Sequence, residues 1–275
     1  MHAIDPLYSV CGFVGGLLVG MTGVGGGSLM TPLLILLFGV HPATAVGTDL
    51  LFAAATKTGG SLVHGLARTI EWTVVRRLAS GSVPSTAITL LVLSHFDLNG
   101  AAMRDLITTV LSVALFVTAG LLIYRRRLLT FFAARVGELS ARQTNRLTFL
   151  SGAVLGVLVS ISSVGAGAIG VTFLILLYPH LPMARIVGSD IAHAVPLTLV
   201  AGLGHWMLGS VDWHIFGSLL VGSLPGIFLG SYLSGRVAEL ALRIILALTL
   251  TVVGSKLAFE QIQNRLATVV SSPNQ

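Results

Sequence analysis

Long apolar stretches, separated by short polar segments, make up most of this chain. Several run for about 18 residues or more, which is enough for a helix to cross a bilayer. They predict membrane spans at about 43–66, 77–95, 103–123, 184–208, 214–235 and 238–258. This pattern is typical of an all-α polytopic membrane protein.

Two other apolar segments, 6–38 and 147–178, are too long for a simple crossing. Each has about 32 residues, whereas a straight span needs about 20. Glycines interrupt both near the centre, in "GMTGVGGGSLMTP" (20–32) and "SSVGAGAIGVT" (162–172). Irregular backbone survives at membrane depth only inside protein or beside a wet cavity. We therefore predict two glycine-broken helices, each either a broken crossing or a re-entrant hairpin.

The two halves of the chain resemble each other. "VGGG" at 24–27 matches "VGAG" at 164–167 with an offset of 140 residues. After a one-residue insertion, "VGTD" at 46–49 matches "VGSD" at 187–190, and "GSVP" at 81–84 matches "GSLP" at 222–225. Such repeats indicate duplicated units. The predicted organisation is a first transmembrane repeat (1–124), a basic cytoplasmic linker (125–147), a second transmembrane repeat (148–260) and a polar tail (261–275).

Loop charge indicates how the two four-segment repeats are oriented. The loop region of the first repeat that contains Arg68, Arg76 and Arg77 corresponds to "MLGSVDWHI" in the second, which has neither Lys nor Arg. Basic residues favour the cytoplasmic side, so equivalent loops should lie on opposite sides. We predict inverted repeats, with the linker in the cytoplasm and both termini outside.

Composition excludes other classes of protein. Hydrophobic residues make up 54% of the chain and charged residues 9%, against roughly 25% charged in soluble domains. The basic residues are explained by membrane topology, so we expect no nucleic-acid partner. No Gly-Lys-Ser/Thr or H-E-x-x-H motif occurs, so we expect no enzyme activity, cofactor or metal. The amino terminus lacks signal-peptide features, and we expect a multi-pass protein of the cytoplasmic (inner) membrane.

Paired helix breaks in inverted repeats are the pattern of a transporter site near the midplane. Helix starts near 26–28 and 166–168 would point free N–H groups at a small anion. The alternative is that the small residues only allow close helix packing. The candidate substrate-binding residues are Thr22, Gly25, Gly26, Gly27, Ser28, Thr48, Lys57, Ser162, Ser163, Gly165, Gly167 and Ser189.

Ionisable residues within the spans form a second group of candidates. Lys57 could contact the anion, pair with Asp49 or extend to an interface. Asp49 and Asp190 could carry protons, since burial favours a protonated carboxyl group, or could accept hydrogen bonds at the neighbouring breaks. The candidates for coupling or gating are Asp49, Asp190, His193, His64 and His205. Packing at the interface is the alternative for His64 and His205.

The motifs "GVGGGSLMTPLL" (23–34) and "AVGTDL" (45–50), with a weaker second copy containing "VGSD", resemble the sulfite exporter TauE/SafE family of bacterial membrane transporters. The resemblance implies transport of small anions such as sulfite or sulfoacetate, without naming the substrate. Ala166 and Ala168 stand where the first copy has Gly26 and Ser28, so "VGAG" lacks one glycine of "VGGG" and the half-sites are expected to bind unequally.

The function predicted from these observations is a secondary transporter for a small sulfur-containing anion, such as sulfite or an organosulfonate. Repeat-related bundles would rock around the site. An anion channel on the same inverted repeat is the alternative, and it would show conductance in planar bilayers instead of saturable exchange. The expected partners are the small anion and the lipid bilayer. The sequence leaves a homo-oligomer open.

Overall fold

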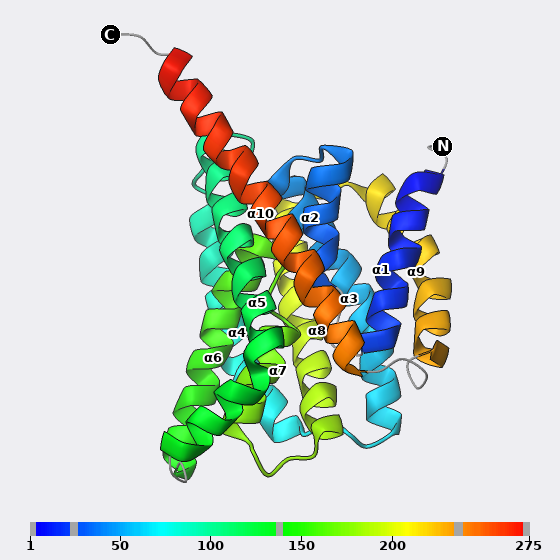
Figure 1. The fold of residues 1–275 in the computed structure, drawn as a ribbon, viewed down its shortest axis with the longest axis vertical. Helices are drawn as coiled ribbons and strands as arrows, with labels where there is room; N and C mark the ends of the chain where they lie inside the picture. Colours follow the sequence, from blue (N-terminus) through cyan, green and yellow to red (C-terminus); the bar gives the residue numbers. More distant parts are fainter. Residues whose placement is uncertain (1–3, 23–26, 136–139, 234–238, 272–275) are drawn as a thin grey trace.

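The computed structural model describes residues 4–22, 27–135, 140–233 and 239–271, with helices as their regular structure (Figure 1). Their order is α1 (Pro6–Thr22), α2 (Gly27–Phe38), α3 (Pro42–Leu66), α4 (Trp72–Leu93), α5 (Ala101–Arg135), α6 (Ala141–Ser162), α7 (Ala168–Leu177), α8 (Met183–Met207), α9 (Trp213–Leu233) and α10 (Glu239–Ser271). The predicted spans match α3–α5 and α8–α10, although α5 and α10 continue further. The predicted division into repeats, linker and tail stays a prediction.

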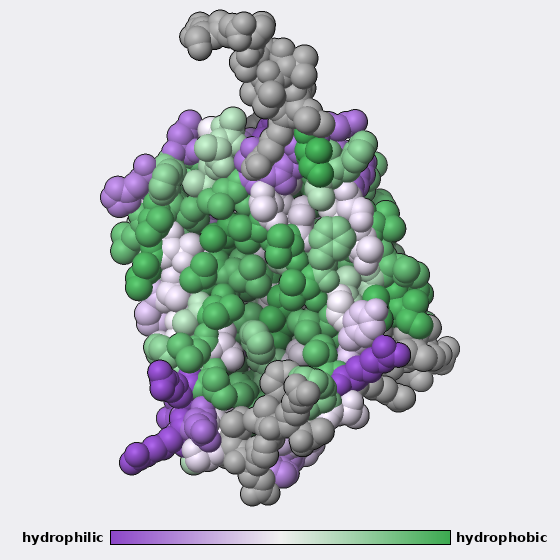
Figure 2. Space-filling view, turned by 60° about the vertical axis from the view of Figure 1, so that its left-hand side comes forward, coloured by the Kyte–Doolittle hydropathy of each residue, from purple (hydrophilic) through white to green (hydrophobic). Residues whose placement is uncertain are grey.

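Within the described residues, five helices are long and apolar enough to cross a membrane: α5, α6, α8, α9 and α10. Shorter apolar helices occur in α1, α2 and α7. Apolar side chains cover the middle of one face of the molecule, and polar ones gather at its two ends (Figure 2). The chain is therefore an all-helical, multi-pass membrane protein, as the apolar pattern predicted.

Both broken segments fold back on themselves. The ring of Tyr8 near the start of α1 lies 4.4 Å, centroid to centroid, from that of Phe38 at the end of α2. In the second half, the Thr148 hydroxyl of α6 lies 2.9 Å from the Tyr178 hydroxyl just after α7. The outer ends of each segment thus meet, as in a hairpin whose two arms enter and leave on one side.

The halves also contact each other reciprocally. α1 packs on α9, and α6 packs on α4. A side chain at Gly12 would collide with the carbonyl of Leu219, and one at Gly152 with that of Leu78. Both pairs are related by the sequence repeat, so close packing explains these glycines. The start of α1 and the end of α10 lie toward one end of the bundle, and the end of α5 and the start of α6 lie at the other (Figure 1). The inverted arrangement of the repeats stays a prediction.

α3 and α8 form the centre of the bundle and pack against each other. Leu50 of α3 and Leu197 of α8 are fully buried in one apolar cluster with Val159 of α6 and Ile169 of α7. This cluster holds the break between α6 and α7 against both central helices. Polar side chains on α3 and α8 can therefore reach the break.

Candidate functional site

The break between α6 and α7 is a buried turn at 163–167. Ser163 ends α6 in the left-handed conformation, with φ of 59°, and its N–H donates to the Val159 carbonyl at 2.8 Å. Gly165 and Gly167 have φ of 127° and 140°, a region that glycine adopts far more readily than other residues. These two glycines shape the turn, and their predicted contact with substrate stays a prediction.

Lys57 of α3 reaches this break from the other half of the chain. Its side chain is buried, and Nζ donates to the Ala166 carbonyl at 2.9 Å. In the described part of the chain no carboxylate oxygen lies within 4 Å of Nζ, so the ion pair considered with Asp49 is not formed. Asp190 and Asp49 both act on Lys57 electrostatically. An ammonium group has three N–H donors, and the Ala166 carbonyl uses one of them.

Asp49, two turns earlier on α3, joins the start of α2 to the second break. Its Oδ2 accepts hydrogen bonds from the Thr31 hydroxyl at 2.6 Å, the Thr31 N–H at 3.2 Å and the Ser163 hydroxyl at 2.9 Å. The carboxylate therefore lies near the positive end of α2, where a negative charge is stabilised. This is the hydrogen-bonding role considered for Asp49, and the protein's own carboxylate lies where an anion was predicted.

Asp190 of α8 corresponds to Asp49 in the repeat, but its surroundings differ. The carboxylate is buried, and Oδ1 has no hydrogen-bond partner in the described structure. Oδ1 faces Gly170 in the first turn of α7, where any side chain would collide with it. Lys57 is the charged group that acts on Asp190 electrostatically. The two carboxylates are thus equivalent in sequence and unequal in hydrogen bonding.

Thr48 and Ser189 hold the loops of the opposite halves. The Thr48 hydroxyl accepts from the Asp212 N–H at 3.0 Å, just before α9, and the Ser189 hydroxyl accepts from the Glu71 N–H at 2.8 Å, just before α4. Both hydroxyls are fully buried. These reciprocal bonds indicate a structural role, and anion binding by either hydroxyl stays a prediction.

His205 and His64 also occupy matching positions. His205 is fully buried, and its Nε2 lies 2.8 Å from the Ser160 carbonyl, so Nε2 is the nitrogen that carries the proton. His64 is half-buried, with Nδ1 2.8 Å from the Thr69 hydroxyl in the loop after α3. Both rings thus stabilise neighbouring structure through hydrogen bonds. A gating role for either residue stays a prediction.

His193 lies in the interior, three residues after Asp190 on α8. Its ring is fully buried, and Nε2 lies 2.8 Å from the Ser82 hydroxyl of α4. Nδ1 has no partner in the described structure, so this ring does not bond the Asp190 carboxylate. His193 therefore joins α8 to α4, next to the charged residues.

The first break is described less completely. Gly25 and Gly26 lie outside the described residues, and of Thr22, Gly27 and Ser28 the structure describes the helical backbone only. Ser162, beside the second break, donates to the Leu158 carbonyl of its own helix at 2.8 Å. Substrate binding by these six residues stays a prediction.

Sequence reasoning missed two partners in this region. Thr31 was read only as part of the "LMTP" motif, although its N–H and hydroxyl both bond Asp49. The Ala166 carbonyl bonds Lys57, and a backbone carbonyl leaves no sequence signal because every residue has one. Among the described residues, no cluster of three or more His, Cys, Asp or Glu side chains could hold a metal ion.

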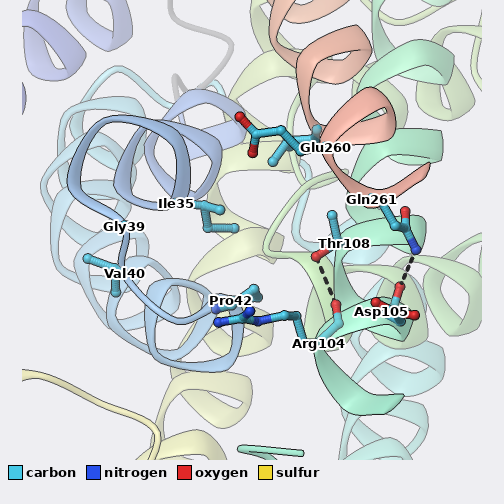
Figure 3. A pocket seen from close by; sticks show the side chains of 10 residues that line it. Ile35, Gly39, Val40, Pro42, Arg104, Asp105, Thr108, Glu260 and Gln261 are labelled. Carbon is cyan, nitrogen blue, oxygen red and sulfur yellow. Dashed lines mark hydrogen bonds between the residues drawn. The ribbon is translucent and has the colours of Figure 1, made fainter. Parts of the chain in front are cut away.

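A separate cavity of about 170 Å³ lies between α2, α5 and α10 (Figure 3). Arg104, Asp105 and Glu260 give its lining charges of both signs. The lining residues are Ile35, Gly39, Val40, Pro42, Arg104, Asp105, Thr108, Leu257, Glu260 and Gln261. None of them is a predicted site residue, so the cavity is distinct from the buried charges around Lys57.

Known proteins resemble the chain over most of its length. "Probable membrane transporter protein YjnA" of Bacillus subtilis is 38% identical over 243 residues, covering 88% of this chain and 95% of that protein. "Probable membrane transporter protein YdhB" of the same organism is 25% identical over 253 residues, covering 90% and 97%. No solved structure matches.

The family model for "Sulfite exporter TauE/SafE" matches residues 8–257, which confirms the resemblance seen in the glycine-rich and "AVGTDL" motifs. This is a family of membrane transporters and not of enzymes. With the match covering both halves, the chain belongs to the sulfite exporter TauE/SafE family.

Proposed function

We propose that this protein is a secondary transporter that moves a small sulfur-containing anion, such as sulfite or an organosulfonate, across the cytoplasmic membrane. The observation that carries the proposal is the position of Lys57. A buried ammonium group bonds the carbonyl of Ala166 at a helix break in the centre of a membrane transporter. Buried lysines in membrane spans mark substrate or ion pathways.

The chemistry around Lys57 suits a small oxyanion. The hydrogen bond to the Ala166 carbonyl uses one of the three N–H donors of Lys57, so two donors remain for a substrate. α7 begins at Ala168, and the first N–H groups of a helix have no acceptor within it. An oxyanion between Lys57 and this helix start would receive hydrogen bonds and favourable charge from both. The main anion contact of the proposed site is therefore at the second break, in keeping with the unequal binding of the two half-sites expected from sequence.

Binding of anions by the purified protein tests this proposal. Isothermal titration against sulfite, thiosulfate, sulfate, sulfoacetate and taurine should identify at least one ligand. The Lys57→Met variant keeps the length of the side chain and removes the charge. It should lower the affinity for that ligand at least about tenfold, since charged hydrogen bonds are worth roughly 1.5–3 kcal/mol.

Lys256→Met is the matched control, because Lys256 of α10 is exposed and pairs only weakly with Glu260, at 3.9 Å. This variant should bind as the unmodified protein does. Equal affinity in the Lys57→Met protein would remove Lys57 from the site. Failure of the whole panel to bind would overturn the proposed substrate class.

A further inference from the structure

Three ionisable groups lie near one another between α3 and α8: the cation Lys57 and the carboxyl groups of Asp49 and Asp190. Both carboxyl groups act on the ammonium group electrostatically. Each of the three side chains is at most 7% exposed, so each charge requires a partner or hydrogen bonds to remain in the interior. Two carboxylates and one cation leave one negative charge in excess.

The two carboxylates do not share that excess equally. Asp49 has three hydrogen-bond donors on Oδ2, and charge-assisted bonds of this kind favour the ionised form. Oδ1 of Asp190 has no donor in the described structure, and none of the described residues donates a hydrogen bond to this carboxylate. The ionised form of Asp190 therefore depends on Lys57.

A substrate anion bound to Lys57 would replace Asp190 as the negative charge that neutralises the ammonium group. With Asp190 still ionised, the interior would hold two uncompensated negative charges beside one cation. We propose that Asp190 takes up a proton when an anion binds at Lys57, and releases it when the anion leaves. This inference rests on the proposed function, and it makes the proton the coupling ion.

The proposed cycle balances in atoms and charge. A proton from water forms an O–H bond at the Asp190 carboxylate as the anion binds. Both then cross with the moving site, the O–H bond breaks on the other side, and the proton leaves with the anion. The empty site returns with ionised Asp190 again facing Lys57. For a monovalent anion, each cycle moves no net charge, and a proton gradient drives the transport.

The groups that face Asp190 leave few other proton carriers. Lys57 of α3 acts on Asp190 electrostatically, Asp49 of α3 acts on Lys57, and His193 comes from α8 itself. α4 contributes the Ser82 hydroxyl, which bonds His193, and α7 contributes Gly170. Among described residues of α4, α6 and α7, no charged group acts on Asp190 electrostatically. His193 is therefore the other candidate for taking up the proton, and the experiment has to distinguish it from Asp190.

Proton uptake during anion binding is the direct test. The purified protein, in weakly buffered solution with a pH indicator, is mixed with methanesulfonate, sulfoacetate or thiosulfate, whose charges stay constant between about pH 6 and pH 8. The expected uptake is about one proton per bound anion. Affinity should then fall about tenfold for each pH unit of increase in the range where Asp190 is ionised in the empty protein.

Asp190→Asn should abolish both effects, because the amide is a permanently neutral substitute. It should bind the same anions with pH-independent affinity and, in proteoliposomes, exchange anion for anion without net uptake driven by a pH gradient. His193→Gln is the control and should keep the proton uptake. Asp190→Glu keeps a carboxyl group, and it should retain uptake with a displaced pH profile if the Asn variant does not fold.

The outcomes separate this inference from the proposed function. Anion binding that depends on Lys57 but takes up no proton would overturn the coupling and leave the anion site in place. Unchanged proton uptake in Asp190→Asn, or its loss in His193→Gln, would also remove Asp190 from the role. Absence of any anion binding would overturn the proposed function and this inference together.

Discussion

α3 and α8 occupy equivalent places in the two halves, yet they contribute differently to the centre of the molecule. Oδ1 of both Asp49 and Asp190 has no partner in the described structure, but Oδ2 of Asp49 in α3 is bonded to Thr31 and Ser163, whereas Asp190 in α8 accepts no hydrogen bond from a described residue. Lys57 of α3 corresponds to Thr198 of α8, whose hydroxyl bonds its own helix. One half thus supplies the cation and the other supplies the break that it contacts.

The later turns of the two helices differ as well. After Ala54, α3 exposes Thr58 and Gly59, whereas the residue of α8 that corresponds to Thr58 is Leu199, 43% exposed. Threonine and glycine suit a watery surface, and exposed leucine suits lipid. This end of α3 lies at the same end of the bundle as the end of α5 and the start of α6 (Figure 1). We therefore expect water to reach α3 beside Lys57 more readily than it reaches the corresponding turn of α8.

The largest expected loss of stability comes from substituting a pair of glycines that α3 and α8 have in common. A side chain at Gly47 of α3 would collide with the Ser210 carbonyl, and one at Gly188 of α8 with the Thr69 carbonyl. Leucine at either position should destabilise the fold by about 3 kcal/mol or more, since backbone cannot move aside cheaply. Fluorescence-detected size-exclusion chromatography should show little folded protein for both variants.

Gly59→Leu is the control for these two variants, because a Cβ atom at this position would have no neighbouring atom within 4 Å. It should fold normally and even gain a few tenths of a kcal/mol from better helix propensity. Folding of Gly47→Leu at the normal level, with loss of Gly188→Leu alone, would contradict the reciprocal packing.

The next effect separates the two carboxylates. Asp49→Asn can keep its amide oxygen at the Oδ2 position, but it loses the negative charge that strengthens three hydrogen bonds, and it should destabilise the protein by about 2 kcal/mol. Asp190→Asn loses no hydrogen bond that the structure shows, and should cost about 1 kcal/mol or less. Thermal unfolding of both variants in the same detergent measures the difference. A larger loss for Asp190→Asn would show that Asp190 has partners comparable to those of Asp49.

The smallest expected effect leaves stability unchanged and concerns access to water. Cys11 is the only cysteine, so Cys11→Ser provides a background for single cysteines at positions 58 and 199. Thr58→Cys should react with a water-soluble maleimide roughly tenfold faster than Leu199→Cys, because the reactive thiolate forms in water and not in lipid. Equal rates would mean that the later turns of α3 and α8 meet the same surroundings.

The sequence alone was enough to predict the membrane class, the glycine break between α6 and α7, and the family, whereas the repeat stays a prediction. Apolar length, glycine content and repeated motifs are local properties of the chain, and the span limits agreed with the helices to within a few residues at most ends. Gly165 and Gly167 could be named in advance because few other residues adopt their backbone angles.

Only the tertiary structure decided how these parts combine. It showed that each broken segment is a hairpin, since Tyr8 meets Phe38 and Thr148 meets Tyr178. It also brought Lys57 to the carbonyl of Ala166, 109 residues further along the chain. Which helices become neighbours depends on the packing of the whole chain. The motifs that contain Asp49 and Asp190 are alike, so they could not reveal that these two carboxylates have different hydrogen-bond partners.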